Sequence, residues 1–293
     1  MHRKDIFLVL LVTVLWGLSF TVIKIGVADM PPLFLCAMRF LFTAIPAAFF
    51  IKKPQTSWAI LASFGLCLGV AVFGLLFVGI KQGMGAGLSS VIMQAQVFFT
   101  ILLSSFIFKE HLQKHQWAAC LLCFAGLGVL AMEQSQPSAL VPFLIVMAAS
   151  FCWGCANIIT KKAGNIDMVG FIVYSSLFSP IPLIGLSFVL DGPEAILHGI
   201  EAMTWTSVLA IGYLAFLATL LAFSLWSHLL QKYKAPVVTP FALLVPVSGM
   251  LCAMIFLGER ITMMEMAGGA LIFTGLIINI MGSRLRTLIG KGS

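Results

Sequence analysis

The chain has 293 residues, of which 61% are hydrophobic and 9% are charged, with a mean hydropathy of +1.09. Soluble domains hold roughly 45–50% apolar and 25% charged residues, so this composition excludes a water-soluble globule. The net charge of +7 does not indicate a nucleic-acid-binding protein, because the 17 Lys and Arg residues are scattered between apolar runs and form no basic stripe.

Apolar runs of about 20 residues, the length needed to cross a hydrocarbon layer, follow one another along the whole chain. We predict ten membrane-spanning helices, at residues 5–28, 32–51, 58–80, 86–108, 115–132, 139–160, 168–190, 204–230, 235–257 and 263–283. The first run is interpreted as a membrane anchor rather than a signal peptide, because no small-x-small cleavage site precedes Asp29. The predicted fold class is therefore an all-α polytopic membrane protein.

The basic residues lie mostly on one side of these predicted spans. With the N-terminus in the cytoplasm, the cytoplasmic connections carry Arg3, Lys4, Lys52, Lys53, Lys109, Lys114, Lys161, Lys162, Lys232, Lys234, Arg284, Arg286 and Lys291. The opposite connections carry Lys81 and Arg260, while Lys24 and Arg39 lie within or at the edge of spans. This asymmetry follows the positive-inside rule and predicts that both termini are cytoplasmic, which requires an even number of spans.

The two halves of the chain repeat each other. Trp16-Gly17 recurs as Trp153-Gly154, with Lys24 matching Lys161 at the same offset of 137 residues. The segment from Ala86 to Met132 matches Ala235 to Met281 at an offset of 149, which superposes Glu110 on Glu259. We predict two five-helix repeats, at 5–132 and 139–283, followed by a basic cytoplasmic tail at 284–293. Because five is odd, the second repeat must be inverted in the membrane, as in many secondary transporters.

A family likeness follows from the two copies of an apolar helix that ends in an acidic turn, Ser105-Phe-Ile-Phe-Lys-Glu110 and Ala253-Met-Ile-Phe-Leu-Gly-Glu259. Together with the two Trp-Gly pairs, they resemble the EamA domains of the drug/metabolite transporter superfamily, over the whole chain. Met30-Pro-Pro-Leu, Ala37-Met-Arg39-Phe, Gln94 to Thr100, Asn157 to Lys162 and Leu243 to Val247 are similar to the bacterial amino-acid metabolite exporters of this family, of the O-acetylserine and cysteine type.

The resemblance implies a secondary transporter of the plasma membrane, the inner membrane of a bacterium, that exports small amino-acid-like metabolites by alternating access. It implies no enzyme activity and no cofactor; the partners are a small-molecule substrate and the lipid bilayer, with a homodimer left open. The alternatives are a permease or facilitator for another solute, such as an aromatic compound, a polyamine or a nucleotide precursor, and a membrane enzyme or sensor. The sequence disfavours an enzyme, because it has no P-loop, no G-x-S-x-G and no intramembrane pair of carboxylates.

Polar residues inside spans are the candidate substrate-binding residues, because such groups are costly in lipid unless they face a cavity or a partner. Two matching stripes at helical spacing hold Trp16, Phe20 and Lys24 in the first half and Trp153, Asn157 and Lys161 in the second. In the functional interpretation, the Trp residues form cavity walls and Asn157 hydrogen-bonds a zwitterion. Helix packing is the alternative for Trp16 and Trp153, and snorkelling to the headgroups is the alternative for Lys24.

Further candidates lie in other spans. Arg39 stays protonated and must find acceptors, either on a substrate or in a structural clamp. Gln94 and Gln96 are separated by roughly 200° around a helix, so we expect only one of them, Gln96, to face the cavity. Tyr213 and Trp226 are further wall candidates.

Residues at span ends are candidates for gating. Glu110 and Glu259 lie at helix ends, where the alternatives are helix capping or local ion pairing. Pro246 in the ninth span has Val97 as its repeat mate, so the fourth span lacks the proline that favours a kink. The seven cysteines lie within apolar runs and lack acidic or histidine co-ligands, so we expect small packing residues and no metal site. Gly65 and Gly69 follow the small-x-x-x-small pattern that predicts close helix crossing.

Overall fold

The computed structural model describes residues 1–134, 136–164, 166–233 and 235–289, and all regular elements in these ranges are helical. The first half forms α1 (Arg3–Asp29), α2 (Pro32–Ala48), α3 (Trp58–Gly65), η1 (Leu66–Gly74), α4 (Leu75–Lys81), α5 (Ala86–Ile92), η2 (Met93–Ala95), α6 (Gln96–Phe108) and α7 (Lys114–Glu133). The second half forms α8 (Pro137–Ala163), α9 (Met168–Ser176), α10 (Pro180–Leu190), α11 (Pro193–Glu201), α12 (Trp205–Gly212), η3 (Tyr213–Leu221), α13 (Ala222–Lys232), α14 (Ala235–Val238), η4 (Thr239–Leu243), α15 (Leu244–Leu257) and α16 (Met263–Ile289).

Eight continuous helices among the described residues are long and apolar enough to span a membrane, and each coincides with a predicted span. A ninth is counted if α9 and α10 form one span that is bent by 41°. The bend arises because Pro180 lacks an N–H and its ring clashes with the carbonyl one turn earlier, so α9 ends at Ser176. The predicted span at 32–51 is shorter than expected, because α2 has 17 residues. These findings establish an all-α multi-span chain, while ten spans and their sidedness stay predictions.

The last predicted span continues beyond its expected end. The backbone of α16 stays helical to Ile289, so part of the predicted tail at 284–293 extends the helix. Residues 290–293, with Lys291, and Lys234 in the α13–α14 connection lie outside the described residues.

Backbone irregularities recur at matching places in the two halves. The π-helices η1 and η3 are both nine residues long, and the 3-10 turns η2 and η4 interrupt the corresponding later helices. Both α6 and α15 end in a left-handed residue, Lys109 with φ 54° and Gly258 with φ 67°, which are separated by the repeat offset of 149. The fourth predicted span is therefore interrupted like the ninth, although it lacks the proline.

The helix termini repeat their caps as well. Ser57 accepts a hydrogen bond from the N–H of Ile60, and Thr204 accepts one from the N–H of Ser207. The N–H of Gln113 donates to the side chain of Gln116 before α7, as the N–H of Thr262 donates to Glu265 before α16. Local sequence in the two halves thus directs the same starts and stops.

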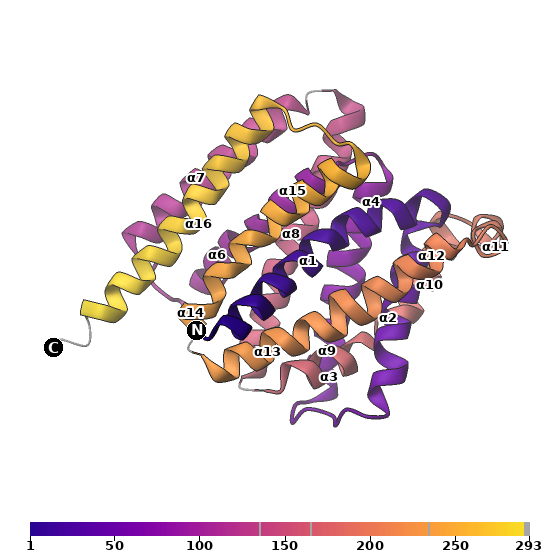
Figure 1. Ribbon diagram of the computed structural model, residues 1–293, viewed down its shortest axis with the longest axis horizontal. Coiled ribbons are helices and arrows are strands. Elements are labelled where there is room, and N and C mark those ends of the chain that lie inside the picture. The colour runs from indigo at the N-terminus through magenta and orange to yellow at the C-terminus, as the bar shows by residue number, and fades with distance from the viewer. Residues whose placement is uncertain (135, 165, 234, 290–293) are drawn as a thin grey trace.

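The first helix of each half packs mainly on helices of the other half (Figure 1). Helix α1 packs on α15 and on α12, η3 and α13, while α8 packs on α6 and on α3, η1 and α4. Helices α7 and α16 lie side by side along one edge of the molecule, and α2 packs on α9 and α10. The end of α4 lies against the start of α8, where a Cβ on Gly79 would lie 2.6 Å from Val146 Cγ2. The same end of α4 also contacts the end of α1, because Lys81 donates to the carbonyl of Ala28 at 3.2 Å. One end of α4 thus meets the end of α1 and the start of α8, so α1 and α8 run in opposite directions.

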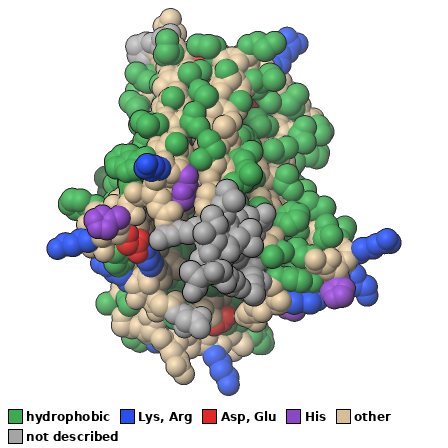
Figure 2. Space-filling view, turned by 90° about the vertical axis from the view of Figure 1, so that its left-hand side faces the viewer, with side chains coloured by type: hydrophobic (Ala, Val, Ile, Leu, Met, Phe, Trp, Pro, Cys, Tyr) green, Lys and Arg blue, Asp and Glu red, His purple; other side chains and the backbone are tan. Residues whose placement is uncertain are grey.

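The outer surface is apolar and the interior is close-packed. Phe50, Phe106 and Ile181 are more than four-fifths exposed, and Figure 2 shows hydrophobic side chains over much of one face, with charged ones around its margins. Such a surface suits contact with lipid. Inside, the predicted close crossing at Gly65 is confirmed, because a Cβ there would lie 2.1 Å from the carbonyl oxygen of Ser175.

Candidate functional site

A cavity of about 160 Å³ lies between helices of both halves. Its lining residues are Trp16, Ser19, Phe20, Arg39, Phe73, Leu76, Met93, Gln94, Gln96, Trp153, Ala218, Phe223, Ala242 and Val245. Five of the predicted substrate-binding residues, Trp16, Phe20, Arg39, Gln96 and Trp153, are therefore brought together from segments far apart in the chain.

Among the described residues that line this cavity, Arg39 is the one that carries a charge. It is buried, with 4% of its surface exposed. One guanidinium nitrogen, Nη2, donates to Thr219 Oγ1 at 3.1 Å, and the guanidinium carbon lies 3.9 Å from the ring centre of Phe73. Nε and Nη1 are buried and have no hydrogen-bond partner among the described residues. A buried cation with unused donors is costly, so the arrangement is suited to an acceptor that enters the cavity.

A short polar network continues from the cavity. Asn157 Nδ2 donates to Gln96 Oε1 at 2.5 Å and to Thr100 Oγ1 at 2.9 Å. Gln94 also lines the cavity, so the expectation that only one of the two glutamines faces it is wrong. Gln94 lies in the 3-10 turn η2 and Gln96 directly follows it. A 3-10 turn advances about 120° per residue rather than 100°, so two side chains that are two residues apart point in less divergent directions than on an α-helix.

The aromatic walls are fixed by packing. Trp16 Nε1 donates to the carbonyl of Ala218 at 3.0 Å, and the Trp16 ring packs against Phe223 and Trp226, with ring centres 5.1 and 5.2 Å apart. Trp153 packs against Phe73 with ring centres 5.8 Å apart. Because its indole N–H is satisfied by backbone, Trp16 presents an apolar face to the cavity.

The lining residues are related by the repeat. Pairs at the repeat offsets of 137 and 149 are Trp16 with Trp153, Met93 with Ala242 and Gln96 with Val245. The first half supplies the polar groups Ser19, Arg39, Gln94 and Gln96, whereas the second half supplies apolar ones. The first half also supplies apolar residues, such as Phe73 and Met93, so the polar lining groups come from one half and the apolar ones from both.

Several predicted site residues lie elsewhere. Tyr213 donates to the carbonyl of Leu15 at 2.7 Å, and Trp226 supports Trp16 from behind, so neither lines the cavity. Pro246 accepts a hydrogen bond from Ser90 at 3.4 Å and joins α15 to α5. Lys24 lies in a separate cavity of about 460 Å³ at one end of the molecule, because its position near the end of α1 carries it past the central cavity.

We call that end the Lys24 end; it contains the end of α1, the α4–α5 link at 82–85 and the end of α15. Lys24 Nζ donates to the carbonyls of Met84 at 2.9 Å and Ile80 at 3.4 Å. Glu259 accepts from the N–H of Ala86 at 2.7 Å and the N–H of Gly87 at 3.0 Å. The prediction that Glu259 caps a helix end is confirmed, although the helix is α5 and not its own.

The opposite end, the Lys161 end, contains the end of α8, the end of α6 and the α13–α14 connection. Here Lys161 forms an ion pair with Glu110 at 2.6 Å. Lys161 and Glu110 are about half exposed, and Lys161 also lies over the Phe108 ring. The local ion pairing predicted for Glu110 is thus present, with a partner 51 residues away rather than the adjacent Lys109.

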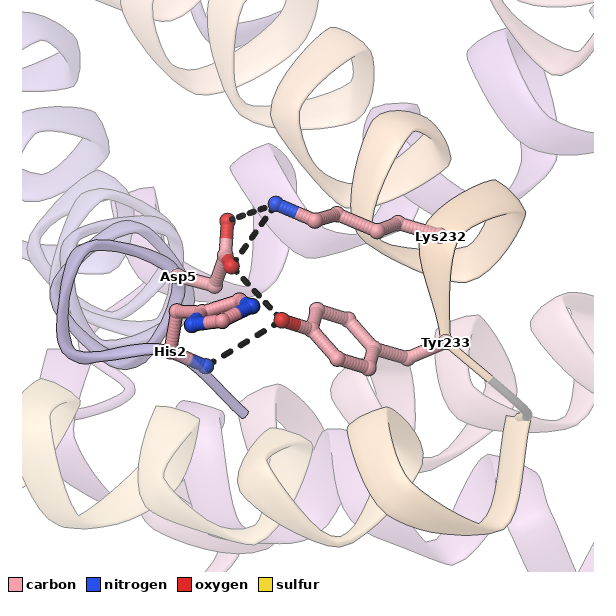
Figure 3. A network of polar contacts seen from close by, with 4 residues as sticks. All are labelled: His2, Asp5, Lys232 and Tyr233. Carbon is pink, nitrogen blue, oxygen red and sulfur yellow. Dashed lines mark hydrogen bonds and ion pairs between the residues drawn. The ribbon is translucent and has the colours of Figure 1, made fainter.

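A polar network at the same end joins α1 to α13 (Figure 3). Lys232 Nζ contacts both carboxylate oxygens of Asp5, at 3.1 and 2.9 Å. The Tyr233 hydroxyl donates to Asp5 at 2.6 Å and accepts from the backbone N–H of His2 at 3.1 Å. The two α-helices are therefore fastened where α1 begins.

The residues that sequence reasoning missed are mainly apolar neighbours of the predicted ones: Ser19, Phe73, Leu76, Met93, Ala218, Phe223, Ala242 and Val245. The repeat offset of 149 could have found one of them, because Val245 is the mate of the predicted residue Gln96. Within the described residues, no group of three or more His, Cys, Asp or Glu side chains could hold a metal, and the seven cysteines are free thiols.

A multi-span helical protein with a cavity between two similar halves has the architecture of a transporter. The model of the EamA-like transporter family matches residues 3–132 and 140–281. The chain belongs to this family and is a multi-pass membrane transporter, not an enzyme.

Named relatives agree with this assignment. A "probable amino-acid metabolite efflux pump" of Salmonella typhimurium is 42% identical over 292 residues, covering 98% of each chain. A protein of the same description from Escherichia coli K12 is 40% identical over 299 residues, covering 100% of both chains. A solved crystal structure shares the fold, with a TM-score of 0.63 and 16% identity over 97% of this chain and 99% of the other.

Proposed function

We propose that this chain is a secondary transporter that exports small amino-acid-like metabolites, of the cysteine and O-acetylserine type, across the plasma membrane by alternating access. The observation that carries the proposal is Arg39, a buried cation with two unused N–H donors in a cavity that is otherwise uncharged among its described lining residues. A carboxylate is the group that best satisfies a guanidinium, because it accepts two parallel hydrogen bonds.

The rest of the cavity suits the remainder of such a solute. Gln94 and Gln96 offer amide groups for an amine, a hydroxyl or an acetyl carbonyl, and Asn157 positions Gln96 through its 2.5 Å hydrogen bond. The apolar wall from the second half fits a thiol or a short hydrocarbon part. Efflux of amino-acid metabolites is named for the two relatives near 40% identity, which supports the same substrate class here.

The topology proposed with this function is ten spans with both termini cytoplasmic and the second repeat inverted. The opposite directions of α1 and α8 and the exchanged packing partners support the inversion. Thirteen basic residues in the cytoplasmic connections of this arrangement support its sidedness. The Lys161 end is then cytoplasmic and the Lys24 end is external.

An aromatic carboxylate is the second candidate substrate. The walls formed by Trp16, Phe73, Trp153 and Phe223 favour a ring, and Arg39 favours its acidic group. The same arginine disfavours a polyamine, which would place a second cation in the cavity.

The test is transport of labelled cysteine and O-acetylserine by proteoliposomes, beside other amino acids, an aromatic acid and a polyamine. We expect Arg39→Met to lower transport of the carboxylate substrates at least about tenfold, because a hydrogen bond to a charged group contributes roughly 1.5–3 kcal/mol. Arg39→Lys restores only part of it, since Lys cannot bind bidentately.

The matched control is Arg3→Met, which removes an exposed arginine that does not line the cavity and leaves transport near the wild-type rate. Transport of cysteine by the folded Arg39→Met protein at the wild-type rate would overturn the assignment of this arginine. Transport of the aromatic acid alone would retain the site and replace the substrate class.

A further inference from the structure

The two ends of the molecule use the same charged residues in two different ways. Lys24 is the repeat mate of Lys161, and Glu259 is the repeat mate of Glu110. At the Lys161 end the lysine and the glutamate bind each other at 2.6 Å. At the Lys24 end their mates are apart, and each binds the backbone.

At the Lys24 end, the two side chains hold the opposite sides of one turn. Lys24 binds the carbonyls of Ile80 and Met84, at the end of α4 and in the link that follows it. Glu259 binds the N–H groups of Ala86 and Gly87, where α5 begins. A cation on the carbonyl end of one helix and an anion on the N–H end of the next are both in their electrostatically favoured positions.

Holding this turn links several helices at the Lys24 end. The turn is fastened to the end of α1 by Lys24 and to the end of α15 by Glu259. Helix α5 packs on α15, and α1 packs on α4 and α5. Four separate helices are thereby drawn together at this end.

The Lys161 end lacks the equivalent links in the described part of the chain. By the repeat, the packing of α5 on α15 corresponds to packing of α14 on α6, and the packing of α1 on α4 and α5 corresponds to packing of α8 on α13 and α14. None of these counterpart pairs packs closely among the described residues. Lys161 and Glu110, whose mates hold the turn at the other end, are engaged with each other and are about half exposed.

We propose that the two lysine–glutamate pairs form a reciprocal gate, in which each pair is joined when its own end is open and separates to hold the adjacent turn when that end is closed. In the opposite state, Glu259 pairs with Lys24 and releases Ala86 and Gly87. Glu110 then leaves Lys161 and accepts from the start of α14, while Lys161 binds the last carbonyls of α13. This gate rests on the proposed alternating-access function and assigns Lys24 to gating rather than to substrate binding.

The two ends are not identical in strength. The counterparts of Ala86 and Gly87 are Ala235 and Pro236, and proline has no N–H. Glu110 therefore gains one fewer donor when it holds the α13–α14 turn than Glu259 gains at the α4–α5 turn. This difference favours the state seen here, in which the Lys24 end is the closed one.

Charge exchange within a pair tests the gate, because it keeps the ion pair but removes the hold on the turn. In the double variant Lys24→Glu/Glu259→Lys, a carboxylate faces the carbonyls and an ammonium faces the N–H groups, so the Lys24 end cannot close. In Lys161→Glu/Glu110→Lys, the Lys161 end cannot close for the same reason. The two variants therefore favour opposite states.

The measurement is amide hydrogen exchange of the full chain in proteoliposomes, read in peptides that cover 80–88 and 229–241. We expect Lys24→Glu/Glu259→Lys to speed exchange at 80–88 and to slow it at 229–241, each by about two- to fivefold. In Lys161→Glu/Glu110→Lys, we expect amide exchange at 80–88 to be as slow as in the wild type or slower. Amide exchange at 229–241 should be as fast as in the wild type or faster. Both variants lower transport, because each hinders one half of the cycle.

Lys162→Gln is the matched control, since Lys162 is adjacent to Lys161, is exposed and has no hydrogen bond or ion pair with a described residue. A change at 80–88 in the first variant without any change at 229–241 would overturn the reciprocal gate and leave only a local cap. If a double variant does not fold, Glu110→Gln serves instead. It loses the ion pair but can still accept from α14, so exchange at 80–88 should rise; an unchanged rate there overturns the gate.

The exchange measurement requires no substrate, so it separates this inference from the proposed function. Reciprocal exchange in a protein that moves no amino-acid metabolite retains the gate and removes the substrate class. Cysteine transport in a protein whose two ends exchange independently retains the substrate and removes the gate.

Discussion

The two halves of this transporter have the same backbone irregularities but different side chains at corresponding places. The π-helices, the 3-10 turns, the left-handed helix ends and the helix caps recur in both halves. The central cavity, by contrast, takes its polar groups from the first half and an apolar wall from the second. The comparison teaches that the two halves share their backbone geometry, while divergence of their side chains makes the lining of the cavity asymmetric.

The joints between helices show the same divergence. Helix α1 meets α13 through Asp5, Lys232 and Tyr233, whereas α8 meets α4 through an apolar contact at Gly79 and Val146. One joint is held by charge and the other by close packing. Three perturbations examine how far the halves are equivalent, from the largest expected effect to the smallest.

The largest effect is expected at the two glycines that let α1 cross α15 and α8 cross α6. A Cβ on Gly17 would lie 2.6 Å from the backbone nitrogen of Gly249, and a Cβ on Gly154 would lie 2.9 Å from Phe99 Cβ. We expect Gly17→Ala to destabilise the protein by about 1–3 kcal/mol, because backbone cannot move aside cheaply. Gly154→Ala should cost less, since its nearest contacts, at 2.9 to 3.2 Å, are longer than those of Gly17.

Thermal unfolding of the purified variants measures this difference. Gly128→Ala is the control, because a Cβ there meets nothing within 4 Å. We expect the melting temperature of Gly128→Ala to equal or exceed that of the wild type. Equal losses for Gly17→Ala and Gly154→Ala would show that the two crossings are equivalent despite their different neighbours.

An intermediate effect is expected at the charged joint. Asp5→Asn removes the ion pair with Lys232 but keeps an acceptor for Tyr233. We expect faster amide exchange in the last turn of α13 and unchanged exchange at the end of α4, whose contact with α8 is apolar. Lys4→Gln is the matched control, because Lys4 is exposed and has no hydrogen bond with a described residue. Added salt should reproduce the Asp5→Asn effect at α13 alone, since screening acts on charge; an equal response at α4 would contradict the distinction.

Much of the fold could be predicted from local sequence. Eight predicted spans coincide with long apolar helices, because a run of about 20 apolar residues satisfies its own backbone hydrogen bonds only as a helix in lipid. The break between Ser176 and Pro180 was missed, because the span at 168–190 was predicted from its apolar run and the effect of a proline within it was not considered. The π-helices were missed for a different reason: nothing in the composition of Leu66–Gly74 or Tyr213–Leu221 distinguishes them from α-helix.

The cavity could be predicted only in part. Trp16, Arg39, Gln96 and Trp153 were found because polar or large residues within spans require an explanation, and each lines the cavity. Lys24 met the same criterion but lies in the end cavity, because the criterion contains no information on depth along the helix. The pairing of Lys161 with Glu110 depends on how α8 packs on α6, which no local pattern contains.

The smallest effect is expected at the helix caps, where the two halves should behave alike. Ser57 and Thr204 both precede a helix and accept from the N–H three residues later, at 3.2 and 3.3 Å. We expect Ser57→Ala and Thr204→Ala each to cost about 0.5–1 kcal/mol, and the double variant to show the sum, because the caps belong to different helices. Thr206→Ala is the control, as its exposed side chain has no hydrogen bond with a described residue. A markedly larger loss for one cap would show that the repeat conserves the geometry of the two helix starts without conserving their contribution to stability.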